Sequence, residues 1–177
     1  MTAVSDLLLG PGRQPAAALE AALSRTGQHL GRLGAGVAPI TDAALCRPLA
    51  GLLEEPVGNL AARGWRQHRL VAEACERTRA NPGSTEVVEL FEHEITSTQR
   101  PRLEVFVDDV RVEVIQLELR VALTVDRVGL TIAGGRIAGW SAGTAVGSAE
   151  LSASGVSLAR REHTVVDLSP PPGEPPA

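Results

Sequence analysis

The pattern of hydrophobic and polar positions divides the chain near residue 80. Apolar residues in 1–80 recur every three or four positions, as in amphipathic helices, whereas in 85–168 they mostly alternate with polar residues, as in half-buried strands. Between the two parts, the turn cluster 81–84 (Asn-Pro-Gly-Ser) is a sequence that no helix crosses. Residues 169–177 (Ser-Pro-Pro-Pro-Gly-Glu-Pro-Pro-Ala) predict a disordered, polyproline-prone tail.

Three helices are predicted in the first part. The first spans about 15–33, with Pro15 suited to a first helical turn. The second spans about 41–53, with Thr41 or Asp42 as its N-cap. The third spans about 56–79 and carries an apolar face.

The second part predicts about seven strands. Asp108-Asp109, Asp126-Arg127, Gly134-Gly135 and Ser154-Gly155 are expected to be tight turns. The predicted strands are 87–99, 103–107, 110–125, 128–132, 137–141, 144–153 and 156–168. Within 110–125 the apolar positions change from even to odd between Val114 and Ile115, which predicts that the buried side of the strand switches there.

Short connections between strands require antiparallel neighbours. The sequence therefore predicts an α+β protein in which an N-terminal helical region (1–80) precedes an antiparallel β-meander (85–168), folded into a sandwich or a barrel.

Composition and charge narrow the class of protein. With 44% hydrophobic residues and a net charge of −4, a disordered chain is not expected, and no apolar run approaches the roughly 18 residues of a membrane span. The first ten residues lack the basic region of a secretory signal, so we expect a cytoplasmic protein with reduced Cys46 and Cys75. All basic residues are arginine and none is lysine, as expected of a GC-rich, bacterial coding sequence.

Glu92-His93-Glu94 is the candidate metal site. On a strand, Glu92 and Glu94 share one face and His93 points to the other, so a metal site needs a further ligand such as His163. A polar edge-strand face is the alternative interpretation. No motif for nucleophilic catalysis, phosphate binding or cofactor binding occurs, so an enzyme is not favoured and no cofactor is expected.

The main basic segment is 63–69, which contains Trp65 and is continued by Arg77 and Arg79. Nucleic-acid binding is not expected, because glutamates dilute this segment and the pI is near 5.6. Trp65 is instead expected to anchor its helix on the β region, with the arginines paired to acids there.

The stretch Ile137–Ala149 contains no charged residue, which is typical of a surface that is covered by helices or by another protein. Trp65, Ile137, Trp140 and Val146 are the candidate interface residues. The sequence thus favours a non-enzymatic assembly or scaffold module that binds itself or another protein. The alternatives are a carrier or sensor of a small apolar ligand inside the β region and, third, a metal-dependent enzyme.

Overall fold

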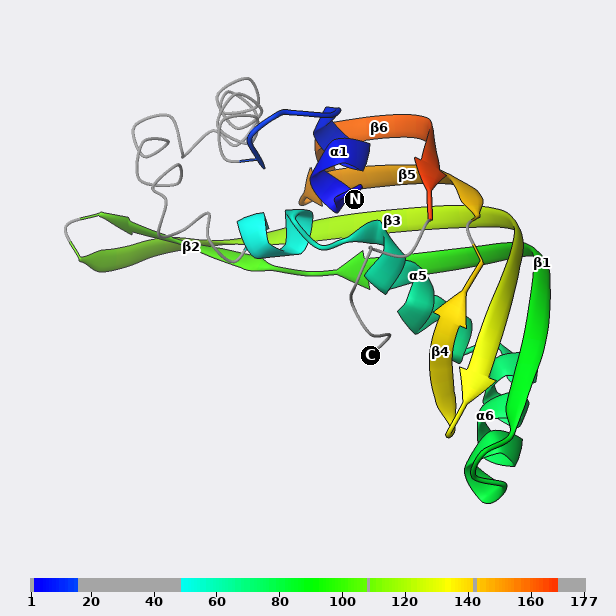
Figure 1. Ribbon diagram of the computed structural model, residues 1–177. Helices are drawn as coiled ribbons and strands as arrows, with labels where there is room; N and C mark the ends of the chain where they lie inside the picture. The colour runs from blue at the N-terminus through cyan, green and yellow to red at the C-terminus, as the bar shows by residue number, and fades with distance from the viewer. Residues whose placement is uncertain (1, 16–48, 108, 142, 169–177) are drawn as a thin grey trace.

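The computed structural model describes residues 2–15, 49–107, 109–141 and 143–168 (Figure 1). The helices are α1 (Val4–Leu9), α5 (Val57–Arg66) and α6 (Arg69–Ala80), and residues 49–53 are also helical. The strands are β1 (Thr85–Gln99), β2 (Arg102–Val107), β3 (Val110–Ala133), β4 (Arg136–Trp140), β5 (Thr144–Ala153) and β6 (Val156–Asp167). The predicted α+β class and the antiparallel pairing of the strands are confirmed.

The long strand β3 is the spine of a single six-stranded sheet. Along one edge, β3 pairs first with β2 and then with β1. Along its other edge it pairs first with β5 and then with β4, and β6 lies outside β5. The sheet is not closed into a barrel and the predicted sandwich is not confirmed: among the described residues the strands form one sheet, whose path runs from β1 to β6 without these two strands pairing.

The glycine-containing hairpin turns form where they were predicted. Gly134 and Gly135 have φ of 57° and 79°, and Ser154 and Gly155 have φ of 48° and 82°. Positive φ at both central residues gives the backbone twist that matches two antiparallel strands. At the other predicted hairpin Val107 pairs with Val110, although Asp108 lies outside the described residues.

The predicted turn at Asp126-Arg127 is wrong, because β3 continues through both residues. Arginine, unlike glycine or asparagine, does not readily adopt positive φ, so this pair is poorly suited to a two-residue hairpin. Both side chains are exposed and stand between the buried Val125 and Val128, so the buried positions change there from odd to even. The sheet bends at this point (Figure 1). Because two of the seven predicted strands form the single strand β3, the sheet has six strands.

The predicted switch at Val114/Ile115 is also wrong. Val114 is exposed while Ile115 is buried, and the odd positions stay buried from Ile115 to Val125. The apolar pattern shifts because Val110 and Val114 lie exposed on the opposite face, not because the strand turns over. The register shift in this hairpin lies between Val105 and Phe106 of β2.

The predicted helix at 56–79 is interrupted, giving α5 and α6. His68 leaves the helical conformation (ψ 132°), and its imidazole accepts a hydrogen bond from the Leu70 N–H (3.3 Å), which caps α6. The predicted helix 15–33 lies outside the described residues apart from Pro15, and only 49–53 of the predicted helix 41–53 is described. The helix α1 was not predicted, because its Leu7-Leu8-Leu9 run is too short for a helical period.

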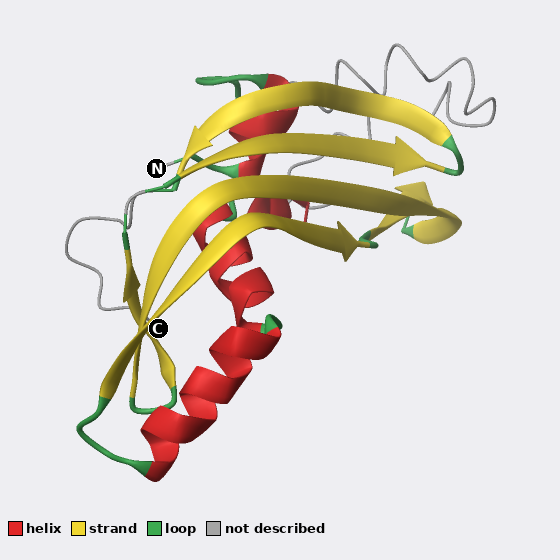
Figure 2. Ribbon diagram, turned by 90° about the vertical axis from the view of Figure 1, so that its right-hand side faces the viewer, coloured by secondary structure: helices red, strands yellow, loops and turns green. Residues whose placement is uncertain are grey.

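All three labelled helices pack on one face of the sheet, here named the covered face (Figures 1 and 2). α1 packs on β5 and β6, α5 on β1, and α6 on β1 and β3. Helices and strands contribute to one hydrophobic core, which includes Leu7, Trp65, Leu123 and Leu130. The opposite face of the sheet is here named the open face. It carries the side chains that alternate with the buried ones along each strand, such as Val146 on β5.

Candidate functional site

The open face carries several of the exposed large apolar side chains. Exposed large hydrophobic residues on it include Val87 and Phe91 on β1, Val146 on β5 and Val165 on β6. A monomer gains nothing by leaving contiguous apolar groups in water, and such groups commonly mark a contact surface. The open face is therefore the candidate site, and its central feature is the pair Val146 and Val165.

Val146 and Val165 stand directly opposite each other on β5 and β6, with Thr124 of β3 beside Val146. Val146 is 43% exposed and Val165 73% exposed. The next row along the sheet has small residues on two strands, with Ala122 of β3 beside Ser148 of β5, and the exposed Glu162 and His163 of β6 lie at the same level. Two apolar side chains thus project beside the small side chains of Ala122 and Ser148.

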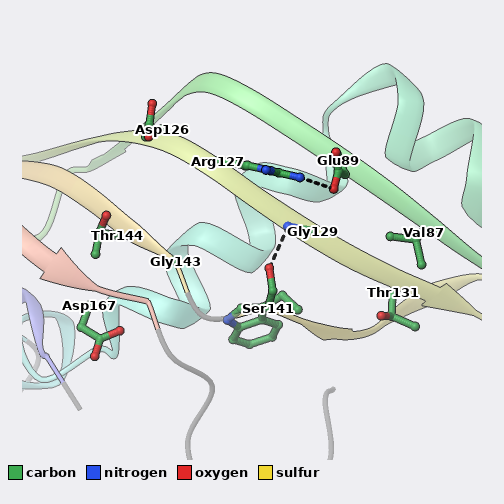
Figure 3. Close-up of a pocket in the computed structure, with 11 residues that line it drawn as sticks. Val87, Glu89, Asp126, Arg127, Gly129, Thr131, Ser141, Gly143, Thr144 and Asp167 are labelled. Atoms are coloured by element: carbon green, nitrogen blue, oxygen red, sulfur yellow. Dashed lines mark hydrogen bonds and ion pairs between the residues drawn. The ribbon is translucent and has the colours of Figure 1, made fainter.

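An acidic groove of about 970 Å³ lies at one end of this face, where β4 separates from β5 (Figure 3). Its ionisable side chains are Glu89, Asp126, Arg127 and Asp167, three carboxylates to one guanidinium. Arg127 donates to Glu89 (2.7 Å) and lies 5.4 Å above the ring of Phe91. The groove therefore has an excess of negative charge.

Backbone and side-chain hydrogen bonds hold the strands together around this groove. The Gly129 N–H donates to Ser141 Oγ (3.0 Å), and the Ser141 N–H donates to the Gly129 carbonyl (2.8 Å; Figure 3). The Trp140 indole N–H donates to the Leu168 carbonyl (2.6 Å). These hydrogen bonds join the end of β4 to β3 and to the residue that follows β6.

Arginines and glutamates occur together at the other end of the open face. Arg120 of β3, Glu150 of β5 and Arg160 of β6 form one row across the sheet. Glu118 accepts hydrogen bonds from both Arg100 (2.8 Å) and Arg120 (2.5 Å), which lower the pKa of that carboxyl. The row itself has two guanidinium groups to one carboxylate.

The four predicted interface residues lie in different environments. Trp65 and Ile137 are buried in the core. Trp140 is half-buried and packs edge-on against Trp65, with ring centroids 5.6 Å apart. Of the four, only Val146 is well exposed, so it is the one placed to contact a partner.

The small side chains of β5 accommodate α1. A Cβ atom added to Gly147 would lie 3.0 Å from Leu7 Cδ2 and 3.1 Å from Leu123 Cδ2. The close packing of α1 explains the small residue here. A carrier of an apolar ligand stays a prediction.

The structure separates the three residues of the candidate metal site. Glu92 and Glu94 are exposed, and Glu92 has a φ of 46° at the bend. His93 is half-buried and its ring meets that of His68 edge-on, with centroids 5.0 Å apart. Within the described ranges, no three or more His, Cys, Asp or Glu side chains are grouped closely enough to hold a metal ion.

The pKa of His93 is lowered from its ordinary value of 6.5, first by burial and then by the charge of His68. The two rings line a groove of about 510 Å³ between the α5–α6 junction and β1, together with Arg63 and Arg69. Protonation of both imidazole rings would place two positive charges side by side.

The arginines of the basic segment form ion pairs and hydrogen bonds. Arg63 pairs with Glu55, Arg69 with Glu73 (3.6 Å), and Arg77 with Glu86 of β1 (2.7 Å). Arg79 donates to the Gly135 carbonyl at the β3–β4 turn (3.5 Å). Because Trp65 is buried, it is not placed to stack on a base.

Sequence reasoning missed Val165, and the reason is the register of β6. The turn at Ser154-Gly155 pairs Ala153 with Val156, and an unbroken ladder from there would pair Val146 with His163. Two register shifts in the β5–β6 ladder move the partner of Val146 to Val165. Nothing in the local sequence marks these shifts. The only signal is Val165 itself, an apolar residue in a mainly polar strand.

Comparisons with known proteins do not assign the site: no family model, no curated protein and no solved structure matches this chain. Among the described residues, no helix is both long enough and apolar enough to cross a membrane.

Proposed function

We propose that this protein is a non-enzymatic assembly module that binds a second copy of itself through the open face of its sheet. The observation that carries the proposal is the pair Val146 and Val165, two neighbouring exposed valines on the face opposite the described helices α1, α5 and α6. A β-sheet that carries apolar side chains on both of its faces is stabilised when both faces are covered.

The energetic argument depends on apolar area. Fully burying a valine side chain stabilises a complex by about 1.5–3 kcal/mol, and a symmetric dimer buries each side chain twice. Val87 and Phe91 extend the apolar surface along β1 beyond this pair. The pair Val146 and Val165 forms the centre of the contact, and the polar rows on either side of the pair form its rim.

The test replaces the central valines with charge. Val146→Glu and Val165→Glu are each expected to raise the dissociation constant of the dimer at least about tenfold, because each would bury an unpaired carboxylate. Sedimentation velocity over a range of concentrations measures the dissociation constant.

The control is Leu70→Glu on α6, since Leu70 is 42% exposed, as Val146 is, but lies on a helix. It is expected to leave the dimer unchanged. A wild-type chain that remains monomeric at every concentration would reject the proposed function.

A further inference from the structure

The pattern of charge on the open face specifies how a second copy would lie on it, an inference that rests on the proposed function. We infer that two copies pair face to face about a two-fold axis that crosses the strands at the level of Gly147, with the acidic row of each copy against the arginine row of the other. The acidic row is Asp126, Thr144 and Asp167, and the arginine row is Arg120, Glu150 and Arg160.

The spacing of the two rows supports this axis. Thr144 and Glu150 are three residues before and three residues after Gly147 on β5, which is about 10 Å in each direction at 3.4 Å per residue. A two-fold axis at the level of Gly147, perpendicular to β5, therefore carries one row onto the other. The face is self-complementary only in this antiparallel orientation.

The facing residues on each strand also have opposite charge. An axis that runs across the strands reverses the strand direction but keeps the order β3, β5, β6. Asp126 of β3 then faces Arg120 of the other copy's β3. Asp167 of β6 likewise faces Arg160 of the other copy's β6. Each interaction occurs twice, so the contact contains four pairs of opposite charge.

The centre of the face is complementary in shape under the same operation. The row that contains Val146 lies one residue from Gly147 on one side, and the row that contains Ser148 lies one residue away on the other. The two-fold axis therefore places Val146 over the Ser148 row of the other copy, where Ala122 is the neighbour on β3. On β5 the larger Val146 thus meets small side chains, as in the packed core of an interface.

The existing ion pairs of the arginine row do not prevent this contact. Arg120 shares Glu118 with Arg100, and Arg160 lies 3.7 Å from Glu162. These pairs are exposed, and exposed ion pairs contribute little to stability, so the guanidinium groups exchange partners at small cost. The acidic groove and the arginine row stay polar and hydrated at the rim of the contact.

The test uses two charge-reversed variants of the full chain. The first is the double variant Asp126→Arg, Asp167→Arg, and the second is the double variant Arg120→Glu, Arg160→Glu. Each variant alone would bring like charges together at every contact, so the dissociation constant of each homodimer is expected to rise about tenfold or more. Mixed in equal amounts, the two variants restore all the opposite-charge contacts and should form a heterodimer.

Native mass spectrometry of the mixture, with one variant labelled with nitrogen-15, separates the heterodimer from both homodimers. Glu76→Arg on α6 is the matched control, because Glu76 is exposed and lies on a helix. Thermal unfolding of each variant verifies that the monomer is folded.

The outcomes separate the two proposals. A heterodimer formed in preference to both homodimers supports the inferred orientation. If the valine substitutions dissociate the dimer but both charge variants still form homodimers, the open face is the interface and the inferred orientation is wrong. If neither set of substitutions affects an existing dimer, the open face is not the interface and both proposals fail.

Discussion

Gly64 marks the closest approach of α5 to the sheet. A Cβ atom placed on it would lie 2.4 Å from Cγ2 and 3.1 Å from Cβ of Ile95, a buried residue of β1. Since the Ile95 Cβ is fixed to the strand backbone, the helix cannot keep its position once a methyl group is added. A single missing side chain thus sets the distance between helix and sheet.

We predict that Gly64→Ala destabilises the protein by about 1–3 kcal/mol, the usual cost of overpacking a core. This sign is opposite to the gain of about 1 kcal/mol that alanine gives over glycine inside a helix. The matched control is Gly58→Ala in the same helix, where the nearest atom of Trp140 would be 3.9 Å away and the helical gain should appear. Urea unfolding measures both; equal effects at the two positions would contradict the prediction.

The pair His68 and His93 gives a pH dependence with a definite sign. The pKa of His93 is below 6.5 in the folded protein, so as the pH falls below 6.5 the unfolded chain binds protons first. The free energy of unfolding therefore decreases below pH 6.5 and levels off below the folded pKa.

We predict that His93→Gln reduces this loss of stability between about pH 7 and pH 5. Urea unfolding at a series of pH values measures it, with the wild type as reference. The charged groups that share the groove are Arg63, Arg69 and Glu94. Of the other groups with lowered pKa, Glu86 and Glu118 act below 4.5, outside this window. An identical decline in the variant would show that other groups cause it.

At the scale of elements, the bend of the sheet is produced by neighbouring irregularities in two strands. Phe91 of β1 pairs with Arg127 of β3, and the buried positions change parity at this level in both strands. In β1 the change occurs at Glu92, whose φ of 46° lies in the left-handed region. A non-glycine residue there costs about 1–3 kcal/mol, which the packing on both sides must offset.

We predict that Glu92→Gly preserves or raises the stability, because glycine adopts this conformation without strain. The matched substitution Glu94→Gly, two residues along the same strand at a regular exposed position, should cost about 0.5–1 kcal/mol. Chemical denaturation of both variants provides the comparison. A larger loss at Glu92 than at Glu94 would show that the bend depends on the glutamate side chain.

At the scale of the whole molecule, one core joins parts that are far apart in the sequence. α1 packs on β5 and β6, and a hydrogen bond from the Gly135 N–H to Thr78 Oγ1 (3.1 Å) joins the β3–β4 turn to α6. Among the described residues, the helices α1, α5 and α6 all pack on one face of the sheet (Figure 2). This asymmetry places the exposed valines and both charged rows on one surface.

The sequence by itself determined the features that depend on near neighbours. The turn residues placed the Gly134-Gly135 and Ser154-Gly155 hairpins, and short connections imposed antiparallel pairing. The odd apolar positions from Ile115 to Val125 identified one buried face of β3. These follow from local φ preferences and from the alternation of side chains along a strand.

Only the tertiary structure decided the features that depend on distant residues. The continuation of β3 through Asp126-Arg127 depends on pairing with β1, a strand some thirty-five residues earlier. The opposition of Val146 and Val165 depends on register shifts that the local sequence does not mark. The contact of His68 with His93 requires α6 to fold back on β1. In each case the physical reason is the same: long-range pairing and packing supply more free energy than the local preference that predicted otherwise.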